Sequence, residues 1–229
     1  MIVHTSAIVL KSFPYGDTSL IAQCFSKDKG KIGVIIKGAR TKKKPKAAFF
    51  EPLSHIDLIY NYRQNRELQI VSKVHFLNYW SRILNNLRSV TLSMAILELT
   101  DKALSFEDPH PNLYVMLKDV LSAINEKDSD PNLLFWFYEC VLLSHLGFRP
   151  NLEQSDLPGL NLPDLDEGPN SRLILSSLLS ERLDKLPKDT VTESDRKIVS
   201  KYLWVLLCYH FEGLNRVKSF QVARAILSD

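Results

Sequence analysis

The spacing of apolar residues changes once along this chain, close to Phe76. Before that point apolar and polar residues alternate in short runs, which is typical of strands with one buried face. After it, apolar residues recur three and four positions apart, as on one face of a helix. We therefore predict an α+β multidomain protein, with a β domain over residues 1–79 followed by an all-helical domain over residues 80–229.

Five short strands account for the β domain. The turn between the second and third contains Gly30, which can adopt a positive φ. Five such strands match a small closed barrel, the five-stranded OB fold, whose exposed face and loops bind oligonucleotides. The strands are expected at residues 5–13, 19–25, 31–37, 53–60 and 68–74.

Apolar stripes and capping residues predict the helices. Asp130 and Pro131 begin a strongly apolar helix, because proline is tolerated in the first turn. Gly147 suits its left-handed end, and Thr192 can cap a later helix. Residues 149–172 contain four prolines and are expected to form a loop. We expect helices at residues 87–103, 113–124, 131–147, 173–186, 192–211 and 219–227.

The densest positive charge in the chain follows the third predicted strand. Such a loop repels itself, so folding alone gives little reason for it, whereas contact with phosphates would release counterions. A solvated loop or a linker is the alternative interpretation. The segment has no acid within residues 37–46, and its six basic residues are Lys37, Arg40, Lys42, Lys43, Lys44 and Lys46.

The overall charge supports an anionic partner for the first part of the chain. Residues 1–80 carry 13 Lys and Arg against 5 Asp and Glu, whereas residues 81–229 carry 16 against 21. A second positive cluster lies near the C-terminal end, although it can equally be a solvated face. Further candidate contacts to nucleic acid are Arg63, Arg66, Arg216, Lys218 and Arg224.

Aromatic residues beside the predicted turns offer surfaces on which bases can stack. Tyr15 and Tyr62 border turns and are the candidates for this role. We expect Phe13 and Tyr60, which lie within strands, to face the barrel core.

Signatures of catalysis, secretion and membrane insertion are missing from the sequence. There is no phosphate-binding glycine loop, no helical zinc-protease motif and no nucleophile elbow, so we expect no enzyme. No apolar run approaches the length of a membrane span, and residues 1–5 do not begin a signal peptide. The three cysteines, Cys24, Cys140 and Cys208, lie far apart within apolar runs, which favours reduced thiols and a cytoplasmic protein.

Several segments resemble, in order and spacing, the RecO family of bacterial recombination mediators. The resemblance covers nearly the whole chain and is most specific in the basic segment. Its N-terminal parts are Phe13–Ile21 (FPYGDTSLI), Phe25–Lys31 (FSKDKGK), Lys37–Arg40 (KGAR) and Phe50–Leu53 (FEPL). Its later parts are Tyr138–Phe148 (YECVLLSHLGF) and Tyr209–Gly213 (YHFEG) with Lys218-Ser219.

This resemblance implies an OB domain, a helical domain and a role in DNA repair at the bacterial nucleoid. It implies binding to single- and double-stranded DNA and annealing of complementary strands. The implied partners are RecR, single-stranded-DNA-binding protein and the RecA recombinase, which the protein would help to load. Lys37 and Arg40 match the family's basic motif residue by residue, whereas the lysines that follow match only its basic character.

The chain departs from many relatives at a zinc site of four cysteines. The first pair of that site corresponds here to Ser155 and Pro158, neither of which can act as a thiolate ligand. No cysteine pair follows in the loop, so we expect no metal and no cofactor. Two readings from other classes remain open at this point: a general RNA-binding OB protein, and a scaffold whose barrel binds an acidic protein surface.

Overall fold

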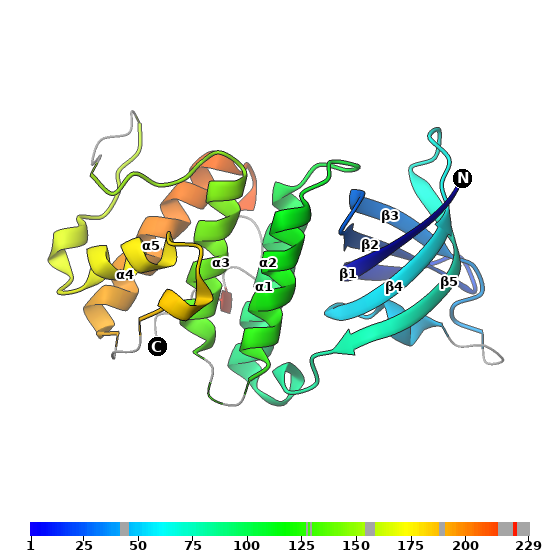
Figure 1. Ribbon diagram of the computed structural model, residues 1–229, viewed down its shortest axis with the longest axis horizontal. Helices are drawn as coiled ribbons and strands as arrows, with labels where there is room; N and C mark the ends of the chain where they lie inside the picture. The colour runs from blue at the N-terminus through cyan, green and yellow to red at the C-terminus, as the bar shows by residue number, and fades with distance from the viewer. Residues whose placement is uncertain are drawn as a thin grey trace. The chain divides into compact units, whose positions relative to one another are not determined.

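The computed structural model describes residues 1–41, 46–126, 128, 130–153, 159–187, 191–214 and 222–223. Within these residues, five strands come first and five named α-helices follow, so the predicted α+β class is confirmed (Figure 1). Contacts divide the chain into two compact units. The first comprises Met1–Leu84 with Leu97–Asp119, and the second comprises Asn85–Ile96 with Val120–Asp229.

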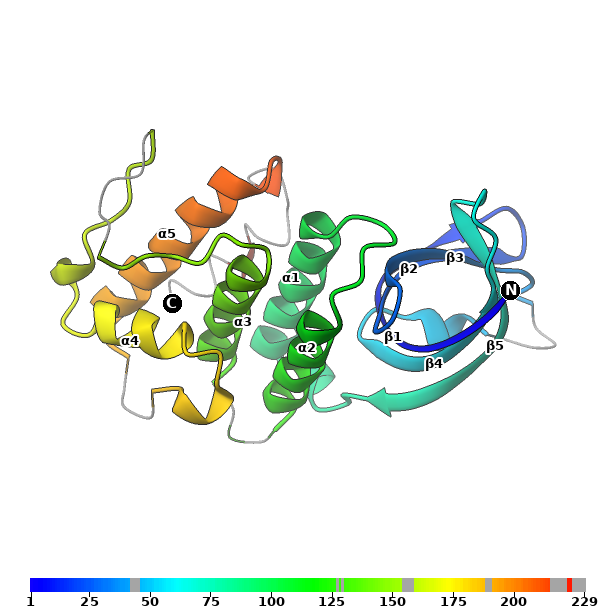
Figure 2. The same cartoon turned by 45° about the horizontal axis from the view of Figure 1, so that its top comes forward.

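The strands of the first unit close into a ring, in the order β1-β2-β3-β5-β4 and back to β1 (Figure 2). All neighbours are antiparallel except β3 and β5, which are parallel. The prediction of a five-stranded OB-like barrel is therefore confirmed. The strands are β1 (Ile2–Tyr15), β2 (Ser19–Ser26), β3 (Gly30–Ile36), β4 (Ser54–Asn61) and β5 (Leu68–Tyr79).

The alternation of apolar residues explains the barrel core. In β4, side chains at alternate positions point inward, and the inner apolar positions are Ile56, Leu58 and Tyr60, all fully buried. The short 3-10 helix Ala47–Phe50 adds Phe50, which is also fully buried. The expected core position of Tyr60 is thus confirmed. The prediction for Phe13 is wrong, because this residue is 43% exposed near the end of β1.

β5 is longer than the sequence pattern predicts. It continues beyond Val74 to Tyr79 and pairs with the start of β4. A register shift between His55 and Ile56 of β4 interrupts the simple alternation, so the period of two is lost in this stretch.

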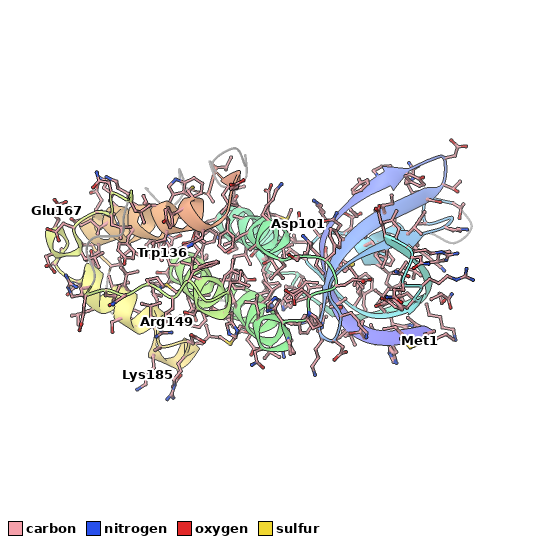
Figure 3. The ribbon with its side chains drawn as sticks, turned by 90° about the horizontal axis from the view of Figure 1, so that it is seen from above. Met1, Asp101, Trp136, Arg149, Glu167 and Lys185 are labelled. Carbon is pink, nitrogen blue, oxygen red and sulfur yellow. The ribbon has the colours of Figure 1, made fainter. Side chains whose placement is uncertain are left out.

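The helices α1 (Leu87–Ala103) and α2 (Pro111–Ile124) both contribute residues to the barrel's unit. Tyr114 of α2 packs edge-on against Phe25, with ring centroids 5.7 Å apart, and its hydroxyl lies 2.9 Å from His55 Nε2. Asp101 of α1 meets two lysines of the barrel, and Figure 3 labels its position. The barrel therefore has a helical partner within its own compact unit.

The second unit contains α3 (Pro131–His145), α4 (Ser171–Leu178) and α5 (Glu193–His210). The predicted caps are confirmed: Asp130 accepts hydrogen bonds from the first turn of α3, Thr192 does the same for α5, and Gly147 has φ 86°. Within the ranges described above, no helix combines the length and apolarity that a membrane crossing requires.

One predicted helix is too long, and another lies mostly outside the described residues. The helix expected over residues 173–186 is too long, because α4 ends at Leu178 and a separate 3-10 turn occupies Leu183–Lys185. Arg149 explains the break: its guanidinium donates to the carbonyl of Leu179 (2.6 Å) and to Glu181, whose φ is 57°. Of the helix expected at 219–227, only residues 222–223 are described, and both are helical.

Candidate nucleic-acid interface

The basic segment, residues 37–46, begins where β3 ends, and hydrogen bonds hold its two ends together. Ala39 is fully buried, and its carbonyl accepts hydrogen bonds from the amides of Lys46 (3.0 Å) and Ala47 (3.2 Å). Thr41 donates through both its amide and its hydroxyl to the carbonyl of Gly38. The predicted contacts Lys42, Lys43 and Lys44 lie outside the described residues. Their two flanks, however, are held against the barrel.

Arg40 connects the basic segment to the turn between β1 and β2. Its Nε donates to the carbonyl of Ser19 (3.1 Å), its Nη2 donates to the carbonyl of Gly16, and its amide donates to the carbonyl of Thr18 (2.9 Å). The side chain is nevertheless exposed, as is that of Lys37. Arg40 therefore fixes two loops to each other while it keeps its charge at the surface.

Strand directions decide which predicted residues share one end of the barrel. β1, β3 and β5 run toward the end at which β2 and β4 begin. That end holds the start of the basic segment and Tyr15, a residue that is 54% exposed. The other end holds the connection from β4 to β5, which contains Tyr62, Arg63 and Arg66. The candidates thus form two separate groups.

The β4–β5 connection is organised by Gln69. Its side-chain oxygen accepts from the Arg63 amide (2.9 Å), and its Nε2 donates to the carbonyls of Arg63 (3.0 Å) and Arg66 (2.8 Å). The Tyr62 hydroxyl donates to Glu107 (3.4 Å). Glu107 also lines a pocket of about 640 Å³ beside this loop, together with Gln23, Gly33, Arg66 and Phe106. Tyr62 is therefore hydrogen-bonded to a carboxylate, which does not suit an open stacking surface.

Three aromatic side chains at the end with the basic segment were missed by the sequence analysis. Phe49, Phe76 and Tyr79 form one cluster on the β4–β5 side. The adjacent pair Phe49-Phe50 was the available signal, since only one of two consecutive rings can enter the core. The position of Phe76 and Tyr79 follows from the extension of β5 and its register shift, which the pattern did not predict.

The loop expected at 149–172 contains ordered polar contacts in its described part. Arg172 donates to Asp166 Oδ1 (3.0 Å) and to the carbonyl of Leu152 (2.6 Å). Asp195 of α5, fully buried, accepts from the Asn170 amide (2.8 Å) and from the Ser171 hydroxyl (2.9 Å). Among the described residues, no three His, Cys, Asp or Glu side chains gather as metal ligands would. Ser155 and Pro158 lie outside those residues, as do Arg216, Lys218 and Arg224.

Comparison with known proteins covers both units. Residues 1–80 match the family model "Recombination protein O N terminal", and residues 84–162 match "Recombination protein O C terminal". A DNA repair protein RecO of Salinibacter ruber is 30% identical over 67% of this chain, an alignment that spans 59% of that relative. Those of Christiangramia forsetii and Flavobacterium psychrophilum are 25% and 22% identical, over 99% and 100% of both chains. Two matching family models in the expected order, and relatives that align from end to end, lead to one conclusion: the chain belongs to the RecO family.

Proposed function

We propose that this chain binds single- and double-stranded DNA through the basic segment, anneals complementary strands and, with RecR, helps to load RecA. The observation that carries the proposal is that hydrogen bonds hold the two ends of that segment in place. Ala39 is buried and Arg40 is bonded to the neighbouring turn, so the described start of the segment is fixed to the barrel with the charge of Arg40 at the surface. The relatives' printed name, DNA repair protein RecO, points in the same direction.

Charge neutralisation provides the mechanism of annealing. Two strands repel each other through their phosphates, and a basic surface lowers that repulsion while the base edges stay free to pair. No covalent step is needed, so the proposed role is that of a non-catalytic mediator. Contacts with RecR, RecA and single-stranded-DNA-binding protein belong to the same proposal and follow from the family resemblance.

A salt titration of DNA binding tests the proposal. If about four to six phosphates are neutralised, the log–log slope for a single strand is about −3 to −4. Replacement of Lys42, Lys43 and Lys44 by Ala should flatten this slope and weaken binding to every sequence alike. The matched control replaces three exposed lysines of the second unit, Lys185, Lys197 and Lys201, and should retain the slope. Unchanged affinity in the first variant would contradict the assigned surface.

Annealing is tested separately with fluorescent complementary strands, a chelator and no nucleotide. We expect the protein to accelerate pairing at low salt and the acceleration to fade as salt rises, because screening weakens contacts to phosphates. Strict dependence on ATP, or no gain over free strands, would reject the mechanism. Tighter binding to RNA than to DNA in a parallel titration would favour the general RNA-binding alternative.

A further inference from the structure

The cluster of Phe49, Phe76 and Tyr79 is an exposed aromatic surface on the barrel. The rings of Phe49 and Phe76 are stacked, with centroids 4.4 Å apart and planes at 25°. Tyr79 meets Phe76 nearly edge-on, at 6.3 Å and 67°. The residues Phe76 and Tyr79 are 44% and 49% exposed, which is unusual for large apolar groups beside a well-filled core.

The backbone holds these rings in place. Phe49 packs against the barrel core beside its neighbour Phe50, which is fully buried within it. Phe76 and Tyr79 lie on β5, which pairs with β4 up to Tyr79. Rings fixed in this way lose little side-chain entropy when a flat ligand covers them.

The cluster is continuous with the basic segment. Lys46 is the last basic residue of that segment, and its carbonyl accepts the amide of Phe49 (3.2 Å). The only acid within residues 37–51 is Glu51, which is exposed and follows Phe50. Cations and ring faces thus occur together at one end of the barrel, a combination that suits a chain of phosphates with unpaired bases.

We propose that Phe49, Phe76 and Tyr79 form a platform on which unpaired bases of a single strand stack while its phosphates contact the described cations Lys37, Arg40 and Lys46. This inference rests on the proposed function and adds a preference for single strands. Bases of a duplex are already stacked inside the helix, so only unpaired bases can cover the rings. An acidic protein partner would use the cations equally well but gives no reason for a stacked and edge-on aromatic group beside them.

The test compares single-stranded and duplex oligonucleotides at one salt concentration. Phe76→Ala should weaken single-strand binding about tenfold and leave duplex binding within about twofold, because stacking on one ring contributes about 1–3 kcal/mol per base. The salt slope should not change, since no charge is removed. Phe76→Leu, which keeps an apolar side chain, guards against a folding defect and should show the same selective loss. Tyr209→Ala is the matched control, because Tyr209 is 51% exposed in the second unit.

A fluorescent base reports stacking directly. The fluorescence of a single strand that contains 2-aminopurine should fall when wild-type protein binds, because the base stacks on a ring. This loss of fluorescence should be much smaller with either Phe76 variant. Equal losses for single strand and duplex, or wild-type behaviour of Phe76→Leu, would overturn the platform while the proposed function stands. A wild-type protein that binds neither nucleic acid would overturn both.

Discussion

Glu139 is a carboxyl group within the strongly apolar helix α3. Its residue is 3% exposed, and burial raises the pKa of this carboxyl well above its usual range. The folded chain therefore favours the protonated form, whereas the unfolded chain ionises near the ordinary pKa. Between the two pKa values the unfolded state binds fewer protons, so stability falls as the pH rises through that window.

We predict that Glu139→Gln raises the melting temperature at neutral pH by several degrees. The amide keeps the shape of the protonated acid and cannot ionise, so the free-energy cost of holding this group uncharged at neutral pH disappears. The gain should shrink as the pH falls through about 4, because wild-type Glu139 then becomes protonated in the unfolded state as well. Thermal unfolding across pH measures this, with exposed Glu212→Gln as control. A variant less stable than wild type at every pH would mean that the carboxylate is ionised and paired.

Single residues also explain which parts of the fold could be predicted from sequence. The turn at Gly30, the cap at Asp130 and the end at Gly147 depend on local backbone chemistry, so their residue types were sufficient. The true end of α4 depends on Arg149, which reaches it from a distant part of the chain. No local pattern contains that contact, and the apolar spacing simply continues past it.

Among the elements, α1 is joined to the barrel by Asp101. Its side chain lies 2.7 Å from Lys11 Nζ and 3.6 Å from Lys31 Nζ, and its backbone carbonyl accepts from Lys31 at 2.5 Å. Lys31 also lies over the ring of Phe106, 4.6 Å from its centroid. Burial lowers the pKa of Lys31, and the charge of Asp101 opposes that effect. The two lysines differ sharply in exposure: 9% for the Lys31 side chain and 46% for that of Lys11.

We predict that Asp101→Ala lowers the free energy of unfolding by about 3 kcal/mol, because it leaves Lys31 buried without its counter-charge. Lys11→Ala removes the exposed partner of the same carboxylate and should cost less than about 1 kcal/mol. Urea denaturation of both variants measures the difference. Equal costs would show that burial of Lys31 does not decide the strength of this junction.

The arrangement of the strands also explains why only part of the candidate site could be predicted from the sequence. The basic segment was visible in the sequence as a charge run, and each strand was recognisable. Which strand ends lie together depends on the parallel pairing of β3 with β5, a long-range feature. For this reason the sequence pattern did not show that the two stacking candidates, Tyr15 and Tyr62, lie at opposite barrel ends. The aromatic cluster was missed because the extension of β5 past Val74 follows from pairing.

At the level of the whole molecule, the barrel's compact unit includes part of the helical sequence. Residues 97–119 belong to it, whereas the sequence pattern changes near Phe76. The domain boundary that the sequence predicts between residues 79 and 80 therefore stays a prediction. The packing of Tyr114 on Phe25 and the Asp101 junction both lie beyond that boundary.

We predict that a fragment of residues 1–119 is markedly more stable than one of residues 1–84. The shorter fragment exposes Phe25 and leaves Lys31 without Asp101. Its melting temperature should be lower by about 10 °C or more, since about 2 kcal/mol corresponds to that shift in a domain of this size. Circular dichroism melts of the two fragments provide the comparison. Equal melting temperatures would mean that the barrel alone is the folding unit.

The ring of strands has one narrow join. β3 and β5 pair only through Gly33–Ile35 and Leu68–Ile70, whereas the other ladders are longer. Separation along this join breaks few hydrogen bonds, so it is the least costly way to open the barrel without global unfolding. In deuterated solvent, amide protons that bridge β3 and β5 should exchange sooner than those between β1 and β4. The ring would then behave over time as a curled sheet that closes and reopens along a single edge.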